Sequence, residues 1–491
     1  MSETYPHFHI VLLADDSGEN LWPIARKQSP ACFAPVQPGA DESLLTATVA
    51  RVQPYSAYPL HIITNNTLSE LLYAELRAHA ELSPEQFELI CPPGDRGSAF
   101  SIALICASIR RDDPDAVVAV LPVDLRVETD ERWSHLLYSA YQIALQDSIV
   151  LIGSRQRHKC RDISYIRPAK RLNDIEDAYE VRTFAANARP ATASRAYHEG
   201  AYWYAGIFVG RAAEILGLLA HAEGKRRRSA ADVESLRRVA ETASFFAMLD
   251  RNAWTTPDAE EVAKTLTYAS FEKAALEHAS NLIMLSTTIG FSTTDSLEDA
   301  GSDVAADTYG NRIVGDALAT ESQSVTVLAQ TPGRFIATYG LDDVCIIDTP
   351  DALLVSKRSQ LKKMDKLLAN MREHNVSQLE TSARRPFAWG TATLLVQAEK
   401  TATWKIELPA GSTFDALSIP YEYGTFSDKQ LKKLREQYAV AQGDVLIQRR
   451  TEGAEPILMG TGDAFEASTE SPLLIMCVEN NPATLIMTAT V

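Results

Sequence analysis

The chain has 491 residues, of which 46% are hydrophobic and 23% charged, as expected of a globular protein with about two to four domains. Its 64 acidic and 47 basic residues give a formal net charge of −17, which argues against a nonspecific nucleic-acid surface or an anionic-membrane surface. No signal-peptide pattern, no apolar run of about 18 residues and no CxxC pair are present, so we expect a cytoplasmic protein without a zinc-cysteine site or a disulfide framework.

The first part of the chain, residues 1–300, alternates short apolar runs with helical patterns. The predicted strands are 9–14, 60–65, 87–92, 116–124 and 148–154, and the predicted helices are 66–80, 98–111 and 131–146. Continuous β-branched runs separated by helices indicate an α/β domain with a mostly parallel sheet covered on both faces. Active sites in such sheets lie at the carboxyl ends of the strands, where the loop at 14–20 and Asp124 both fall.

Two β-rich parts follow. Residues 301–375 are expected to form short strands and then an amphipathic helix over 357–374. A polar linker at 375–386 leads into the last part, 376–491, where many short strands and a polar helix at 427–437 suggest a small β-barrel.

The stretch "LLADDSGENLWPIARKQSPACF" (12–33) is typical of a phosphate-binding loop in one respect: an apolar strand leads into a Ser-Gly turn ahead of a helix. Asp15, Asp16 and Glu19 nevertheless place negative charges where a phosphate cradle needs glycines and cations. The sequence therefore predicts a loop that has the position of a phosphate-binding loop but the wrong charge to bind phosphate.

Several motifs together resemble the bacterial family in which mannose-1-phosphate guanylyltransferase is joined to mannose-6-phosphate isomerase. They are "LWPIAR" (21–26), "RGSAFSIAL" (96–104), "VLPVD" (120–124), "WYAGIF" (203–208), "GNRIVGD" (310–316), "ATYGLDDVCIIDTPDALLVSKR" (337–358) and "RPFAWG" (385–390). The resemblance implies a Rossmann-like nucleotidyltransferase α/β domain, a β-helical segment and a C-terminal cupin-like barrel. It also implies transfer of the guanylyl group of GTP to a sugar 1-phosphate, with release of pyrophosphate. Such a reaction would supply GDP-mannose for a polysaccharide.

The resemblance assigns roles to seven positions. Asp124 and Arg26 would be catalytic, with Asp124 a ligand of Mg²⁺; Ser17, Gly18 and Arg96 would bind nucleotide; Gly206 and Tyr165 would bind sugar.

Other positions depart from the family pattern at the charged, reacting groups. The differences are Asp15 and Asp16 for two glycines, Asn20 for an arginine, Ala31 for a lysine, Thr293 for a second metal carboxylate and Tyr204 for a sugar-binding asparagine. Arg26, Arg96 and Lys27 are the cations left near the loop, so we expect impaired nucleotidyl transfer. The alternative is that the retained arginines form salt bridges with Asp15, Asp16 and Glu19 and close the loop to a ligand.

The C-terminal part departs as well. None of the ten histidines follows residue 374, and Gln437 stands where the family has a metal-binding histidine, although Glu436 is kept. We therefore expect no zinc in the cupin-like domain and no isomerase activity.

Three hypotheses remain open: a divergent guanylyltransferase, a non-catalytic partner of an active paralogue, and a structural protein without ligand. A less favoured version of the first lets Asp15, Asp16 and Asp124 recruit extra Mg²⁺. The partners expected are GTP or GDP-mannose and a homo-oligomer or hetero-oligomer with an intact paralogue, with no nucleic acid and no membrane.

Overall fold

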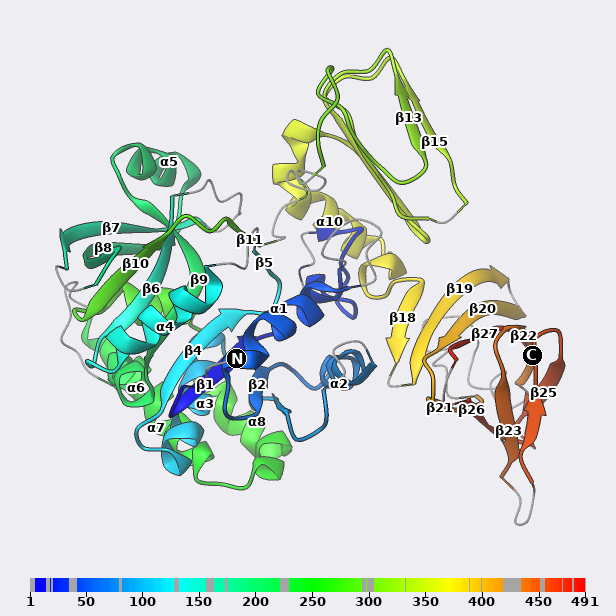
Figure 1. Ribbon diagram of the computed structural model, residues 1–491, viewed down its shortest axis with the longest axis horizontal. Coiled ribbons are helices and arrows are strands. Elements are labelled where there is room, and N and C mark those ends of the chain that lie inside the picture. Colours follow the sequence, from blue (N-terminus) through cyan, green and yellow to red (C-terminus); the bar gives the residue numbers. More distant parts are fainter. Residues whose placement is uncertain are drawn as a thin grey trace.

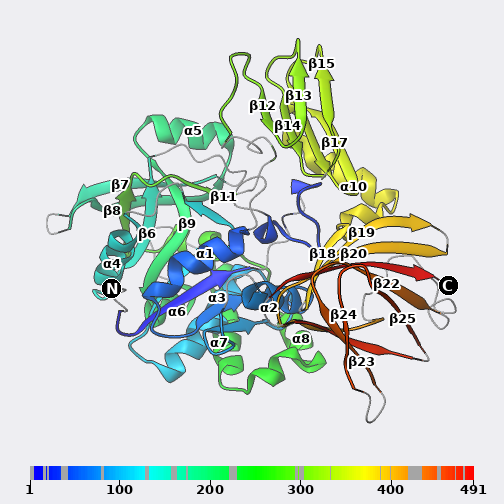
Figure 2. The same cartoon turned by 45° about the vertical axis from the view of Figure 1, so that its right-hand side comes forward.

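A computed structural model shows three units that follow one another along the chain (Figure 1). It describes residues 5–14, 18, 21–34, 42–78, 82–127, 132–155, 163–172, 175–220, 229–293, 297, 304–331, 333–387, 389–398, 400–417, 434–450, 455–469, 471–478 and 481–490. The three units are an α/β unit, a β-rich segment that ends in a helix, and a β-barrel (Figures 1 and 2).

The α/β unit is built on a nine-stranded sheet in the order β3-β2-β1-β4-β9-β6-β10-β8-β7. The strands are β1 (Phe8–Leu13), β2 (Leu60–Ile63), β3 (Phe87–Ile90), β4 (Val117–Pro122), β6 (Ile149–Ser154), β7 (Ile163–Arg171), β8 (Ala178–Ala188), β9 (Tyr202–Arg211) and β10 (Leu282–Thr287). Strands β3, β2, β1 and β4 are parallel, as are β6 and β10, whereas β9 lies antiparallel between β4 and β6. A small ladder joins β5 (Leu125–Val127) to β11 (Phe291–Thr293).

Helices cover both faces of this sheet, as the sequence predicted. One face packs against α3 (Ser98–Asp112), α6 (Ala212–Ala220) and α7 (Ala230–Ala247), and the other against α1 (Leu44–Val52), α2 (Ser69–Ala78) and α4 (Trp133–Ala144). The further helices are α5 (Pro190–His198), α8 (Pro257–Lys264) and α9 (Phe271–Ala274), with 3-10 turns η2 (Ala31–Phe33), η3 (Gln53–Tyr55), η4 (Arg251–Thr255) and η5 (Leu276–His278). β1 and β4 are buried along nearly their whole length because side chains on both faces enter a core.

The middle unit, here called the β segment, is a short coil of strands that pair in parallel, except that its last strand, β17, pairs antiparallel with β16. One sheet has the order β12-β14-β16-β17 and the other pairs β13 with β15. The strands are β12 (Arg312–Val314), β13 (Ala317–Thr320), β14 (Thr326–Ala329), β15 (Ile336–Tyr339), β16 (Val344–Thr349) and β17 (Ala352–Lys357). Val325, Val327 and Ile346 fill its interior. The predicted helix is present as η6 (Arg358–Lys363) and α10 (Met364–Glu373), while residue 357 belongs to β17.

The third unit is a cupin-like barrel made of two antiparallel sheets. The larger has the order β18-β19-β20-β27-β22-β25, and the smaller β21-β26-β23-β24. The strands are β18 (Arg384–Phe387), β19 (Gly390–Ala398), β20 (Thr401–Leu408), β21 (Thr413–Asp415), β22 (Arg435–Gln442), β23 (Val445–Arg449), β24 (Ile457–Met459), β25 (Ala464–Ser468), β26 (Leu473–Cys477) and β27 (Ala483–Thr490); η7 (Ser377–Leu379) precedes them. The barrel lies beside the α/β unit, with α2 against β18 (Figure 2).

Two local predictions in this part are wrong. The end of the predicted polar helix, residues 435–437, lies in strand β22, where alternate side chains point inward; residues 427–433 lie outside the described part of the chain. The predicted linker also ends early, because residues 384–386 already belong to β18.

Among the described residues, no helix combines the length and apolar character that crossing a membrane requires.

Candidate functional site

The carboxyl ends of β1 and β4 meet at one edge of the sheet. The backbone N–H of Val123 donates to the carbonyl of Leu13 at 3.1 Å, and Ala14 N–H donates to Ile63 at 2.8 Å. Asp124 follows directly in the turn between β4 and β5 and is half-buried. The loop after β1 therefore starts beside Asp124, as predicted from the sequence.

Thr293 lies on the other side of Asp124. Strand β11 pairs antiparallel with β5, and Thr293 stands opposite Leu125, the residue after Asp124. The backbone position implied for a second metal carboxylate is thus adjacent to the first, and the residue there is a threonine; Asp295 lies outside the described residues. Within the described part of the chain, no three His, Cys, Asp or Glu side chains are arranged to hold an ion.

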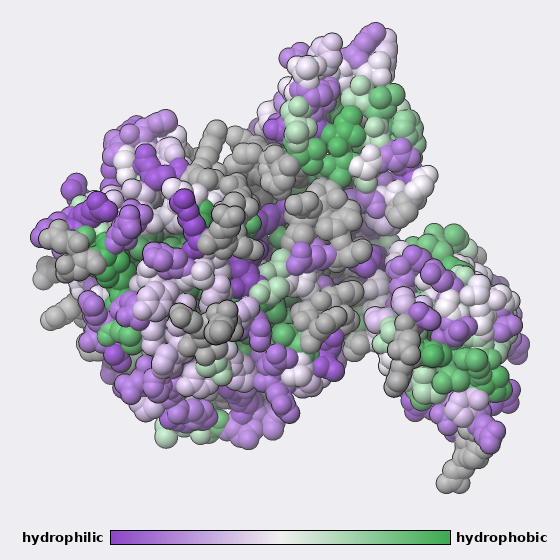
Figure 3. All heavy atoms as spheres, viewed as in Figure 1, coloured by the Kyte–Doolittle hydropathy of each residue, from purple (hydrophilic) through white to green (hydrophobic). Residues whose placement is uncertain are grey.

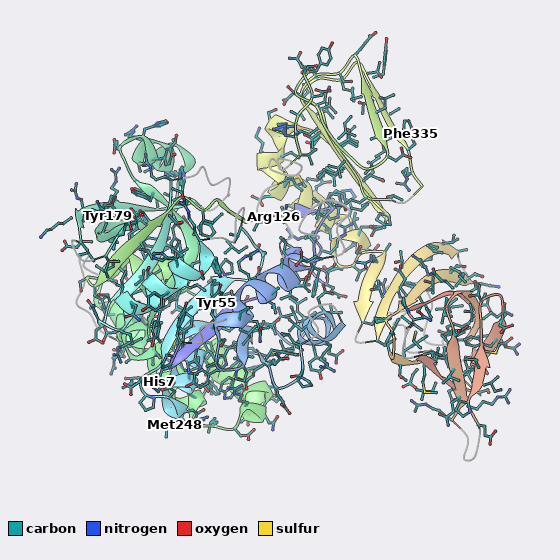
Figure 4. The ribbon with its side chains drawn as sticks, in the orientation of Figure 1. His7, Tyr55, Arg126, Tyr179, Met248 and Phe335 are labelled. Carbon is teal, nitrogen blue, oxygen red and sulfur yellow. The ribbon has the colours of Figure 1, made fainter. Side chains whose placement is uncertain are left out.

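A cation near this edge was missed from the sequence. Arg126 lies on β5, two residues after Asp124, and pairs with Ser292 of β11. Figure 4 marks it at the side of the α/β unit toward the β segment. No sequence motif singled it out, and only the β5–β11 ladder brings it beside Ser292 and Thr293.

The predicted sugar positions lie on neighbouring strands. Gly206 of β9 has φ of 77°, and a Cβ there would stand 3.3 Å from Pro122, two residues before Asp124. Tyr165 of β7 pairs with Trp203 of β9. The structure therefore brings Gly206 to the same edge as Asp124, with Tyr165 on β7, the strand that pairs with β9 there.

Tyr204, in place of the implied asparagine, is a buried phenol. It is 8% exposed, its ring lies 5.1 Å from that of Phe184, and its hydroxyl has no hydrogen-bond partner among the described residues. Burial raises the pKa of Tyr204 well above its usual value, and the charge of Glu272 adds to this. The side chain thus fills space and presents no solvated polar group for a sugar.

The loop itself is described only in part, since Ser17 and the acids Asp15, Asp16 and Glu19 lie outside the described residues. Gly18 has φ of 61°, and a Cβ on it would approach the Cβ of Ala31 to 2.9 Å. Ala31, at the implied lysine position, is 5% exposed. This position is therefore packed against the loop.

Arg26 does not reach toward solvent. Its side chain is 1% exposed, its Nη2 donates to Oδ1 of Asp351 at 3.2 Å, and its Nη1 donates to the carbonyl of Pro23. The guanidinium also lies 5.5 Å from the ring centre of Trp22. Burial lowers the pKa of Arg26, and the carboxylate of Asp351 opposes that shift. A phosphate contact for Arg26 stays a prediction, and it would require this buried ion pair to break.

The residues around Arg26 are fastened to the β segment and to the chain that leads into the barrel. Trp22 Nε1 donates to the carbonyl of Gln378 at 3.0 Å, and Lys27 pairs with Glu380 at 3.1 Å. A shared apolar core accompanies these bonds. Its members are Leu21, Trp22, Ala25, Ala31, Leu297, Leu328, Cys345, Ile347, Leu354, Leu361, Met364 and Leu368. No sequence motif pointed to this junction.

Comparison with curated proteins finds relatives that align over most of the chain. A mannose-1-phosphate guanylyltransferase of Salmonella muenchen is 26% identical over 83% of this chain and 82% of its own length. The xanthan biosynthesis protein XanB of Xanthomonas campestris is 22% identical over 84% of this chain and 83% of its own. This chain is a relative of the mannose-1-phosphate guanylyltransferases.

No family model matches the chain. A solved structure, described as a mannose-1-phosphate geranyltransferase from Thermus thermophilus, superposes with a TM-score of 0.61 over 74% of this chain and 99% of that chain, at 20% identity. This likeness shows a shared nucleotidyltransferase-like fold.

Arg96, which was predicted to bind nucleotide, directly precedes Gly97 and helix α3. It is half-buried, and its carbonyl accepts from the N–H of Ala269 at 3.2 Å. Gly97 follows with φ of 79°, where a Cβ would lie 2.4 Å from the carbonyl oxygen of Ala269. The Nε of Arg96 is buried without a partner among the described residues. Its backbone thus helps to start α3, and a nucleotide contact by its side chain stays a prediction.

The barrel of this guanylyltransferase relative keeps Glu436 in its interior. This side chain is 0% exposed, accepts from the N–H of Leu417 at 2.8 Å and accepts from the hydroxyl of Tyr438. Gln437 points outward and is exposed. Trp404 and Tyr438, at 0% and 1% exposed, belong to the apolar core of the barrel.

Proposed function

We propose that this chain is a mannose-1-phosphate guanylyltransferase-like protein of GDP-mannose or polysaccharide-precursor metabolism in which nucleotidyl transfer is impaired. One observation carries the proposal. Of the residues described in and after the loop, 18 and 21–34, the cations are Arg26 and Lys27, and both are ion-paired with acids of the β segment and its connector.

Electrostatics explain why this matters. Nucleotidyl transfer depends on cancelling the charge of the triphosphate and of the leaving pyrophosphate. Five differences from the family pattern (Asp15, Asp16, Glu19, Asn20 and Ala31) each make the loop one charge more negative. A like-charge pair about 4 Å apart costs roughly 4 kcal/mol at an effective dielectric constant near 20. A few such pairs would remove ordinary nucleotide affinity.

Mg²⁺ would have an incomplete site. Asp124 would hold the ion, and the bound ion would neutralise phosphate charge. The carboxylate that the resemblance implies at the position of Thr293 is missing, so we propose weak Mg²⁺ binding.

Loss of isomerase activity is part of the same proposal. The chain has no histidine after residue 374, and the retained Glu436 is engaged by Tyr438 and Leu417 inside a filled barrel. We propose no zinc in this barrel.

A second candidate is a non-catalytic partner that binds an active paralogue or a sugar nucleotide. It is favoured by the retained scaffold: relatives align over more than four fifths of the chain, while the differences fall on charged positions.

The deciding experiment measures pyrophosphate release by the purified chain with Mg²⁺, GTP and mannose 1-phosphate, next to the Salmonella muenchen relative. We expect no release above background. Turnover within about a hundredfold of that control, roughly 3 kcal/mol in activation free energy, would contradict the proposal.

The variant Asp15→Gly/Asp16→Gly/Asn20→Arg should gain GTP affinity if the negative charge of the loop causes the impairment. A pull-down with an intact paralogue tests the second candidate function.

A further inference from the structure

Arg155, which no sequence motif singled out, follows strand β6 at the carboxyl edge of the sheet. Phe208 of β9 stands opposite both Val120 of β4 and Leu151 of β6, so these two strands run level with each other. Asp124 and Arg155 each come four residues later in the chain. Only β9 lies between β4 and β6, and neighbouring strands are about 4.8 Å apart, so the two strand ends are roughly 10 Å apart. Arg155 therefore lies at the edge of the candidate site, across β9 from Asp124.

The side chain of Arg155 is held in one direction although it is exposed. Its guanidinium carbon lies 4.8 Å from the ring centre of Tyr197 in α5 and 5.2 Å from that of Tyr202 in β9. Its Nη1 donates to the carbonyl of Ala201 at 2.8 Å, and the hydroxyl of Tyr197 donates to the carbonyl of Arg155 at 2.7 Å. Tyr197 in turn stacks on Trp203, with ring centres 5.0 Å apart. Two rings and a backbone carbonyl therefore orient this guanidinium.

No acid within the described part of the chain forms an ion pair with Arg155, although acids outnumber bases by 64 to 47 in the whole sequence. Other arginines of the α/β unit are paired, such as Arg167 with Glu199 at 2.7 Å and Arg237 with Glu234 at 2.9 Å. Figure 3 shows mainly hydrophilic side chains over α5, which borders this position. A guanidinium presents a planar fork of N–H donors that matches a phosphate or a carboxylate. Arg155 thus offers an oriented positive charge to an anion from solution.

We propose that Arg155 binds a second anionic group of the sugar ligand, at the end of the hexose remote from its anomeric phosphate. This rests on the proposed function, in which the anomeric phosphate lies near Asp124 and the sugar lies over Gly206 of β9. The strand that carries Gly206 separates Asp124 from Arg155, so a hexose phosphate that starts at Asp124 extends toward Arg155. The ligand class is a hexose 1-phosphate with a further phosphate or carboxylate group.

Isothermal titration calorimetry on the full chain, without nucleotide, tests the proposal with ligands that differ in one anionic group. The wild-type chain should bind mannose 1,6-bisphosphate at least about tenfold more tightly than mannose 1-phosphate, because hydrogen bonds to a charged group are the strong ones. Arg155→Gln should lose this preference and bind mannose 1-phosphate as the wild type does. Glucuronic acid 1-phosphate next to glucose 1-phosphate makes the same comparison for a carboxylate. Equal affinities of the wild-type chain within both pairs, or no binding of any of these ligands, overturns the proposal.

Arg132→Gln is the matched control. Arg132 is also exposed, and its Nη1 donates to the hydroxyl of Thr288 at 2.7 Å, directly after strand β10 ends at Thr287 beside β6. This variant removes the same charge near the same edge and should keep the preference for the second anionic group. Arg155→Lys keeps the charge without the planar fork and should retain part of the preference. Equal losses in Arg155→Gln and Arg132→Gln would assign the preference to the net charge of the edge and overturn the role of Arg155.

The titration is independent of the pyrophosphate measurement. Pyrophosphate release close to that of the control enzyme would contradict the impaired transfer but would leave a preference that depends on Arg155 intact. A wild-type chain without that preference would overturn the role of Arg155 and leave the impaired transfer standing.

Discussion

The two retained residues Arg26 and Glu436 show two ways in which a polar side chain can be buried. Arg26 in the α/β unit reaches Asp351, 325 residues away in another unit. Glu436 stays within the barrel, where Tyr438 and Leu417 satisfy it. Both residues stand at positions that the family resemblance links to reaction centres, and both are engaged by protein groups. Arg26 connects the α/β unit to the β segment, whereas Glu436 stabilises the interior of the barrel. Substitutions at the two sites should therefore destabilise different parts of the molecule.

The largest effect is expected at the junction between units. Asp351→Ala leaves the guanidinium of Arg26 buried without its charged partner, and breaking a buried pair on one side costs about 3–5 kcal/mol. Asp351 Oδ2 also accepts from the N–H of Ala383, at the entry to the barrel. Hydrogen exchange should therefore accelerate in residues 21–34 and around β18, together with a lower urea midpoint.

Two variants sharpen this prediction. Glu380→Gln breaks the exposed pair with Lys27 in the same junction, where about 0–1 kcal/mol is expected. Arg26→Met/Asp351→Leu removes both buried charges and should recover most of the stability. If Asp351→Ala behaves like Glu380→Gln, the buried pair does not hold the junction.

A pH effect is expected from a buried cluster within the α/β unit. His61 of β2 lies 3.3 Å from His9 and 3.2 Å from Glu88, which itself pairs with Arg251. Burial, followed by the positive charge of Arg251, lowers the pKa of His61 to about 4. The unfolded imidazole takes up its proton near pH 6.5, so the free energy of unfolding should fall as the pH drops from about 6.5 to 4, by up to about 3 kcal/mol.

Urea unfolding at several pH values measures this slope. His61→Leu should flatten it, and the exposed His135→Gln should leave it unchanged. A slope that survives His61→Leu would assign the effect to other groups.

The parts of the structure predicted from the sequence are those with local periodicity. Strands β1, β4 and β6 were located within two residues at each end because apolar β-branched runs mark them, and α3 because of its helical pattern. Strand β9 was not predicted to lie antiparallel between β4 and β6, since sheet order depends on contacts far apart in the chain. The same holds for the site. Motif matches pointed to Asp124 and Gly206, whereas the pair of Arg26 with Asp351 has no local sequence signal.

The smallest effect is expected inside the barrel. Tyr438→Phe removes the hydroxyl that donates to the buried carboxylate of Glu436, which should cost about 1–3 kcal/mol. Because these partners belong to one unit, faster hydrogen exchange should be confined to barrel strands such as β20, β22 and β27, and residues 21–34 should exchange as in the wild type. Glu436→Gln, which keeps an acceptor, should cost less than Glu436→Leu. If Tyr438→Phe also loosens residues 21–34, the barrel and the junction respond as one unit, and the contrast between Arg26 and Glu436 fails.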